Sequence, residues 1–349
     1  MANIHDVARA AHVSISTVSR VVNHDPAVHP ALRVAVEEAV RALRYRPNAA
    51  ARSLRLARTS TVGVVVFELA NPALITIVQE VERIARGRGV SIFLCESAGD
   101  FDAQGAHLER LLERRVDGVI VHPFGPYHAQ VAPVREAGIP VLVIGHHAPS
   151  SGHAEIVVDE REATLNAYRL LFRQGHRRIG LVGRGDETAL NMNAARELQS
   201  GAMPERLAVY RAAHLEAGLP LDPALIRLAR DGTEAHERTR ALLACPDRPT
   251  ALICGVHSDT PEILIAVRAA GLRIPRELSL IAYGDSRWSE AYAPPLTVIR
   301  RDYPAYGRLA AGMLFDLIDG GRGETVRFQA AELVVRASCA PPASVEALV

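Results

Sequence analysis

The chain has 349 residues, of which 48% are hydrophobic and 23% are charged, a composition typical of a globular protein with two or three domains. No apolar run approaches the ~20 residues that span a bilayer, so we expect no membrane-spanning segment. Four widely spaced cysteines without a C-x-x-C pair argue against a disulfide framework or a zinc ribbon. The N-terminus lacks the basic start and apolar core of a secretory signal, so we expect a cytoplasmic protein.

Charge is distributed unevenly along the chain. Residues 1–60 carry nine arginines and four acidic residues, whereas the whole chain has a formal net charge of only +1. A basic end on a slightly acidic body suggests that this end meets a polyanion. Charge alone is equally compatible with an ordinary solvated basic face, and it does not separate DNA from RNA or from an anionic membrane.

The basic end contains three segments with helical periodicity. The first lies near residues 4–11. Ser14 is the candidate N-cap of a second helix over residues 15–23, and Pro30 suits the first turn of a third. Two helices joined by a three-residue turn, with a third packed over them, predict an all-α helix-turn-helix headpiece over residues 1–46.

A helical wheel of the second segment separates an apolar face from a polar one. Val18 and Val21 cluster on the side that would face the core, whereas Ser16 and Arg20 lie opposite, with Ile15 at the edge. Arginine pairs with guanine in the major groove, and isoleucine can contact a thymine methyl group. This face therefore predicts base readout, with a three-helix bundle bearing an ordinary solvated face as the alternative.

Residues 47–58 are predicted to form a linker with one short helix. Asn48 could cap a helix over residues 49–56, which is too short to be stable alone in water. Its alanines permit close approach to DNA, its arginines reach phosphates, and Leu54 is a large apolar side chain that can wedge between base steps in the minor groove.

Two blocks resemble the lactose-repressor (LacI/GalR-type) family of transcriptional regulators. Residues 13–23, VSISTVSRVVN, resemble the family's recognition segment, and YRPN at 45–48 followed by ARSL at 51–54 resembles its hinge helix. The resemblance implies a homodimer on a pseudo-palindromic operator of double-stranded DNA, with a small-molecule effector. It assigns base readout to Ile15, Ser16 and Arg20. It assigns phosphate contacts to Asn3, Ser14, Thr17, Ser19 and Asn23, and hinge or minor-groove contacts to Asn48, Ala51, Arg52 and Leu54.

The remaining chain alternates apolar strand-like runs with amphipathic helical stretches. Strands are predicted at residues 61–67, 90–94, 118–121, 140–144, 156–158, 178–182, 251–254 and 278–282. Repeated βα units predict an α/β core with two doubly wound parallel-sheet lobes. The resemblance continues to about residue 340 and implies a periplasmic-binding-protein-like core over residues 59–340. We expect one lobe from residues 59–158 plus 292–322, a second from 159–290 plus 323–340, and a tail over 341–349.

Several motifs of enzymes and metal sites are incomplete. Gly183-Arg184-Gly185-Asp186 resembles the start of a dinucleotide fingerprint, but Thr188 occupies the position of its last glycine. The histidines show no metal-ligand spacing, and no G-x-S-x-G elbow occurs. We therefore expect no enzyme, no catalytic residue, no metal and no cofactor. The rival classes, a solute-binding receptor and a Rossmann-type enzyme, lack an export signal and a full glycine fingerprint, respectively.

The expected effector site departs from the family pattern. Val256-His257 replaces the usual Asn-Asp, and Gly284 precedes Asp285 where the family has two carboxylates. A sugar or sugar derivative is the expected effector. The departures weaken the case for an ordinary free sugar, and Arg161, Arg230, His146 and His257 favour an anionic effector instead. The candidate effector contacts are Leu74, Phe124, His146, Arg161, Arg230, His257 and Asp285.

Overall fold

The computed structural model describes residues 2–22, 25–45, 58–123, 125, 127–145, 153–185, 203–321 and 326–343, excepting the side chains of residues 157 and 326–330. Residue contacts divide the chain into two units, Met1–Ser60 and Thr61–Val349. Among the helices described, none combines the length and apolar character needed to cross a bilayer. Of the expected hinge over residues 47–58, only the last residue is described.

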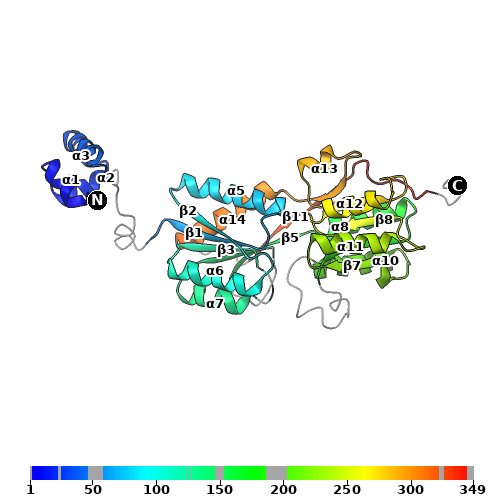
Figure 1. Ribbon diagram of the computed structural model, residues 1–349. Coiled ribbons are helices and arrows are strands. Elements are labelled where there is room, and N and C mark those ends of the chain that lie inside the picture. The colour runs from blue at the N-terminus through cyan, green and yellow to red at the C-terminus, as the bar shows by residue number, and fades with distance from the viewer. Residues whose placement is uncertain are drawn as a thin grey trace. The chain divides into compact units, whose positions relative to one another are not determined.

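The first unit is a three-helix headpiece (Figure 1). It contains α1 (Ile4–Ala10), α2 (Ile15–Val22) and α3 (Pro30–Ala42), which confirms the three predicted helices. The Asn3 side chain accepts hydrogen bonds from the backbone of His5 and Asp6, and the Asp6 carboxylate accepts one from the Asn3 backbone, which forms a capping box. Seven small apolar residues form the core between the helices: Val7, Ala8, Val18, Val21, Val28, Val36 and Ala39.

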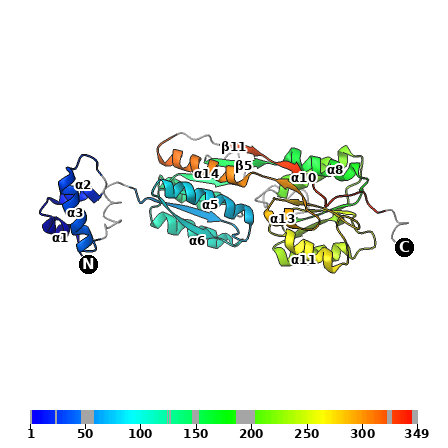
Figure 2. The same cartoon turned by 90° about the horizontal axis from the view of Figure 1, so that it is seen from above.

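The first lobe of the second unit is a six-stranded parallel sheet. Its strands are β1 (Thr61–Val66), β2 (Ser91–Glu96), β3 (Gly118–Val121), β4 (Val141–Ile144), β5 (Ala154–Asp159) and β11 (Val326–Ala330), in the order β11-β5-β4-β3-β1-β2. Helices α5 (Pro72–Gly87) and α14 (Tyr303–Ile318) cover one face, and α6 (Phe101–Glu113) and α7 (His128–Glu136) cover the other (Figure 2). Val64 and Val65 are both buried, on opposite faces of β1, as expected for a strand covered by helices on both sides.

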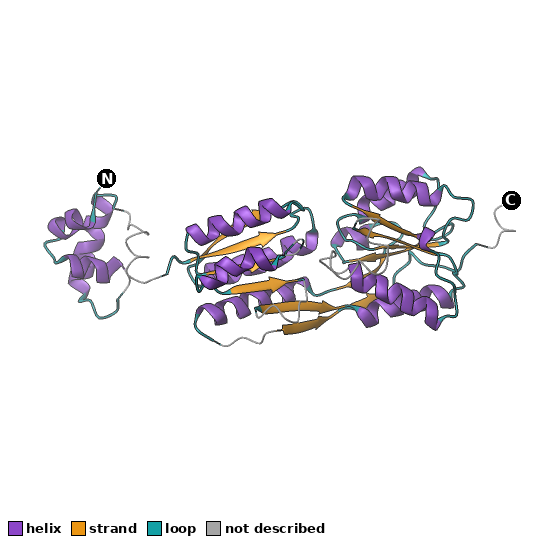
Figure 3. Cartoon of the chain, turned by 90° about the horizontal axis from the view of Figure 1, so that it is seen from below, coloured by secondary structure: helices purple, strands orange, loops and turns teal. Residues whose placement is uncertain are grey.

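The second lobe repeats this architecture. Its strands are β6 (Ile179–Arg184), β7 (Ile226–Ala229), β8 (Ala251–Cys254), β9 (Ser279–Tyr283), β10 (Thr297–Arg300) and β12 (Glu332–Val334), in the order β12-β10-β9-β8-β6-β7. All described pairs are parallel except β10 with β12. Helices α8 (Arg161–Arg173) and α10 (Met203–Glu216) pack on one face, and α11 (Gly232–Leu243) and α12 (Thr260–Ala269) on the other. Figure 3 shows helices on both sides of the strands. The prediction of two doubly wound lobes is confirmed.

The chain passes between the lobes at three places. It leaves the first sheet at Glu160, between β5 and α8, and returns at residues 301–302, between β10 and α14. It crosses again at Ala331, between β11 and β12. The expected lobe boundaries at residues 292 and 323 therefore assigned two strands, β10 and β11, to the wrong lobe. Strand β10 pairs with β9 in the second sheet, and β11 pairs with β5 in the first, because pairing between distant strands is not encoded in the local apolar pattern.

The turn between α1 and α2 contains a residue in the left-handed region. His12 is exposed and has a φ of 52°, a conformation that costs a non-glycine residue about 1 kcal/mol. Replacing His12→Gly should therefore stabilise the headpiece by about 1 kcal/mol, which corresponds to roughly fivefold slower exchange of its core amides in the intact chain. The matched change His5→Gly, inside α1, should accelerate exchange instead; equal effects of both changes would contradict the argument.

Candidate DNA-binding surface and interlobe site

Helix α2 buries one face and exposes the other. Val18 and Val21 are 0% and 4% exposed, whereas Ile15 is 41% exposed. Ser16 and Arg20 also lie on the exposed side. The predicted separation of the core face from the polar face is confirmed, so these three side chains are available to a partner of the headpiece.

The start of α2 is fixed by a local hydrogen bond. The Ser14 hydroxyl accepts from the backbone N–H of Thr17 at 3.0 Å and lies 2.9 Å from the Thr17 hydroxyl, which agrees with the predicted N-cap. Ser14 is exposed, whereas Thr17 and Ser19 are partly buried. With Asn3 at the start of α1, two of the expected phosphate contacts therefore lie at helix N-termini, where backbone N–H groups favour anions.

An ion pair positions the guanidinium of Arg20. Its Nε lies 2.8 Å from a carboxylate oxygen of Asp25, and the Arg20 side chain is 50% exposed. The hydrogen bond from Arg20 lowers the pKa of Asp25. Arg33 donates to the Asp25 backbone carbonyl at 2.6 Å, so it anchors the loop that holds this carboxylate. The sequence analysis missed Asp25, because its loop position resembles an ordinary turn.

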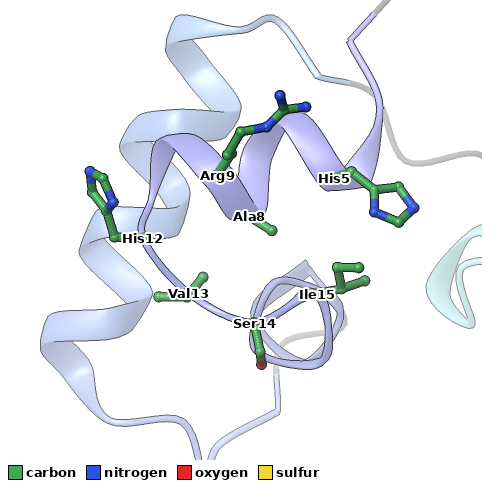
Figure 4. Close-up of a pocket in the computed structure, with 7 residues that line it drawn as sticks. All are labelled: His5, Ala8, Arg9, His12, Val13, Ser14 and Ile15. Atoms are coloured by element: carbon green, nitrogen blue, oxygen red, sulfur yellow. The ribbon is translucent and has the colours of Figure 1, made fainter.

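A shallow hollow lies beside the exposed end of α2. His5 and Arg9 project from α1, His12 comes from the turn, and Ser14 and Ile15 come from the start of α2 (Figure 4). Ser14 and Ile15 were predicted contacts, whereas His5, Arg9 and His12 were not, because the helical periodicity of this segment gives no role to its polar side chains. They place further hydrogen-bond donors next to the residues expected to read bases.

Between the lobes, two arginines share one carboxylate. Glu160, which is 2% exposed, lies at the first crossover, and Arg301 lies at the second. Arg206 of α10 donates to Glu160 and to the backbone carbonyl of Gly255, and its guanidinium lies 3.8 Å above the Tyr283 ring. Arg301 Nη2 lies 3.4 Å from the other oxygen of Glu160. Burial alone would raise the pKa of Glu160, but the two arginines lower it.

A second polar contact joins the lobes at the ends of β1 and β6. Glu68 of the first lobe accepts from Arg184 at 3.3 Å and from the Ser258 hydroxyl at 2.9 Å. Arg184 also pairs with Asp259, which is buried. Arg184 belongs to the glycine motif that resembled a dinucleotide fingerprint, and here it forms this interlobe ion pair.

His257 lies near the cluster of Glu160, Arg206 and Arg301. The residue is 5% exposed, and its ring centroid lies 6.2 Å from that of Trp288 and 6.4 Å from that of Tyr303. Neither ring nitrogen has a hydrogen-bond partner among the described residues. Burial, reinforced by Arg301, lowers the pKa of His257 to about 4, so the imidazole is neutral near pH 7.

Gly284 provides the space for this ring. A Cβ atom at position 284 would lie 2.5 Å from Cγ and Nδ1 of His257, and the residue has a φ of 82°. The two departures noted in the sequence, His257 and Gly284, are therefore one structural change, because the imidazole occupies the volume next to the absent side chain.

The other expected effector contacts are dispersed. Leu74 is 3% exposed and packs in the core of the first lobe. The Arg230 side chain is 81% exposed and pairs with Glu234 at 3.0 Å, and Arg161 is exposed at the start of α8. The Asp285 carboxylate pairs through both oxygens with Arg336, at 3.0 and 2.7 Å. Asn23, Asn48, Ala51, Arg52, Leu54, Phe124 and His146 lie outside the described residues.

Five charged residues of the interlobe contacts were missed by the sequence analysis: Glu68, Glu160, Arg184, Arg206 and Arg301. All of them except Arg206 follow or end a strand. Because ligands bind at the carboxyl ends of parallel strands, their position in the sequence could have indicated them as site residues. In the described part of the chain, no group of three or more His, Cys, Asp or Glu side chains could hold a metal ion.

Comparisons with known proteins agree with this geometry. Residues 3–48 match the profile of the bacterial regulatory proteins of the lacI family, and residues 168–339 match a periplasmic binding protein-like domain. The HTH-type transcriptional repressor PurR of Aliivibrio salmonicida is 31% identical over 341 residues, covering 97% of this chain and 99% of the relative. The ribose operon repressor of Escherichia coli is 32% identical over 321 residues, covering 91% and 93%.

A solved structure with the same architecture carries both units. The lac repressor dimer bound to operator and the anti-inducer ONPF is 25% identical and covers 97% of this chain and 99% of that one, with a TM-score of 0.81. The exposed polar face of α2, the two parallel-sheet lobes and these relatives lead to one assignment. The chain belongs to the lacI family of bacterial regulatory proteins and is a DNA-binding transcriptional regulator, not an enzyme.

Proposed function

We propose that the chain is a cytoplasmic repressor that binds a pseudo-palindromic operator as a homodimer and responds to a small molecule held between its lobes. The observation that carries this proposal is the exposed face of α2, where an apolar side chain and an arginine lie beside hydroxyl groups, while the valines of the same helix are buried. The proteins PurR and the ribose operon repressor, which are named as repressors, support the direction of control.

In this proposal α2 enters the major groove. Ile15, Ser16 and Arg20 read bases, and the headpiece residues Asn3, Ser14, Thr17, Ser19 and Asn23 contact phosphates. The hinge residues Asn48, Ala51, Arg52 and Leu54 act in the minor groove. His5, Arg9 and His12 add donors around the hollow beside Ile15, where they suit the phosphate backbone.

The effector is proposed to be a sugar or sugar derivative that binds at the strand ends between the lobes. Two sets of charged contacts support this location. The Glu68–Arg184 pair joins residues of different lobes, and the Glu160–Arg206–Arg301 cluster joins two of the segments that connect the lobes to a helix of the second lobe. A ligand that favours one arrangement of the lobes over another changes operator affinity through linkage. Carboxyl ends of parallel strands are the usual ligand-binding edge of such sheets.

An exposed edge strand supports self-association. Strand β2 is at the edge of the first sheet and exposes Phe93 and Leu94 by 42% and 40%. Large apolar side chains on an unpaired edge favour contact with another chain. A second copy meeting this edge would bring two headpieces to one operator, as a two-fold operator requires.

Deletion of residues 1–60 tests the proposal directly. The remaining unit has its own sheets and cores, so it should stay folded and dimeric while losing salt-dependent binding to an operator selected from a randomised duplex library. Circular dichroism, sedimentation and fluorescence anisotropy measure these properties. A truncated chain that still binds the selected operator would exclude the headpiece as the DNA-binding unit.

Replacing Arg20→Gln should relax the sequence preference at one base pair of each half-site, with a loss of about 1–3 kcal/mol in discrimination. The matched control is Arg41→Gln, which removes the same charge from the exposed surface of α3. The control should weaken binding to all sequences alike and leave the preference unchanged. Repeating the selection with both variants measures this difference; an unchanged preference in the Arg20 variant would limit Arg20 to phosphate contact.

Replacing Glu68→Gln should weaken the contact between the lobes, because it removes the charge that faces Arg184. The expected loss is about 1 kcal/mol, which lowers the Tm of the second unit by about 2–4 °C. The control Glu80→Gln removes a carboxylate that pairs with Arg83 on the surface of α5, where the loss should be below about 0.5 kcal/mol. Equal Tm values for the two variants would contradict the interlobe role of Glu68.

A further inference from the structure

The charges of the interlobe cluster do not balance. Arg206 and Arg301 each form an ion pair with Glu160, and among the described residues neither has a second carboxylate within ion-pair distance. The side chains of Glu160 and Arg206 are 2% and 6% exposed, and that of Arg301 is 21% exposed. Glu205 acts on Arg206 over a longer distance, whereas Glu160 is the one carboxylate that acts on Arg301 among the described residues. Two guanidinium groups on one carboxylate therefore leave the charge of Arg301 poorly compensated in a largely dry environment, which is unfavourable unless another anion compensates it.

The neighbouring ion pair does not supply that anion. The Asp285 carboxylate acts on the nearby His257, but both of its oxygens are engaged by Arg336. The Nε atom of Arg301 is buried and has no hydrogen-bond partner among the described residues. The surplus charge therefore resides at Arg301, which also retains an unused donor and the largest exposed fraction in the cluster.

Hydrogen-bonding groups without partners among the described residues lie beside this cation. Both nitrogens of the neutral His257 ring lack partners among the described residues, and Oε2 of Glu160 accepts no hydrogen bond there although Arg301 lies 3.4 Å away. A neutral imidazole offers one donor and one acceptor, and a carboxylate oxygen accepts from a hydroxyl group. Buried groups of this kind are stabilised when a ligand supplies matching hydroxyls.

We propose that the effector of this protein is a small hydroxylated anion whose negative group pairs with Arg301 while its hydroxyls bond to His257 and Glu160. This inference rests on the proposed function, since it assumes that the effector binds between the lobes. The anion-binding role expected of Arg230 is assigned instead to Arg301 and Arg206, because Arg230 pairs with Glu234 at the surface. A hydroxycarboxylate and a phosphorylated polyol share the required chemistry.

A thermal-shift experiment on the full chain tests the ligand class. The probes are pentoses and hexoses, the aldonates made from them, and their monophosphates, each at millimolar concentration and at ionic strength matched with sodium chloride. At least one anion should raise the Tm by several degrees, whereas its neutral parent sugar should not. Aldonates acting alone identify a carboxylate ligand, and phosphates acting alone identify a phosphorylated one.

Variants at adjacent positions separate the site from general charge effects. Arg301→Gln should abolish the shift and Arg301→Lys should retain part of it, whereas the control Arg300→Gln should respond as the parent does, because Arg300 pairs with Glu332 on the exposed side. Without ligand, Arg301→Gln should also leave the Tm unchanged or raised, since it removes an uncompensated charge.

Three results would each overturn the inference: shifts with neutral sugars only, shifts in Arg301→Gln equal to those of the parent, or no shift with any anion beyond that of sodium chloride. Operator binding by the same preparations is measured by anisotropy. A chain that binds the operator but fails these tests refutes the ligand class alone, whereas a chain that binds no operator refutes the proposed function.

Discussion

The ion pairs of the buried Glu160 carboxylate hold together two of the segments that connect the lobes. It lies where the chain first leaves the first sheet, and its two arginine partners come from the second crossover and from α10 of the second lobe. The backbone carbonyl of Glu160 also accepts from the Thr164 hydroxyl, which contacts the Tyr283 hydroxyl at 2.8 Å. The connecting segments are thereby held to each other by charge as well as by covalent continuity. Removing the Glu160 carboxylate would leave two guanidinium groups without their ion-pair partner.

Among its described residues, the headpiece is stabilised by a small apolar core and by helix caps, not by buried ion pairs. Its core consists of small apolar side chains, mostly valine and alanine, so local terms such as the Asn3 capping box and the Ser14 N-cap carry much of its order. A small core is easily perturbed. The second unit has four clusters of buried apolar residues packed on both faces of two sheets. Regulation in this protein therefore couples a large sensor to a much smaller DNA-binding unit.

The parts of the fold that could be predicted from the sequence are those encoded locally. The three headpiece helices follow from a 3.6-residue period and their capping residues, and β1 follows from a continuous apolar run. Strands β7, β10, β11 and β12 were not predicted. All four are short, and β7, β11 and β12 lie at sheet edges and carry polar or charged residues. The interlobe cluster could not be found in this way either. Glu160 and Arg206 are 46 residues apart in the sequence, and only the pairing of distant segments brings their side chains together.

The absence of a Cβ atom at Gly284 limits which substitutions positions 257 and 284 can accept. Any larger residue at position 284 collides with the imidazole of residue 257, so the two positions cannot be exchanged one at a time without loss of packing. Substitutions in direct contact are non-additive, and here the coupling is steric. A change of ligand preference at this corner of the molecule therefore requires joint substitutions, in which residue 257 becomes smaller when residue 284 gains a side chain.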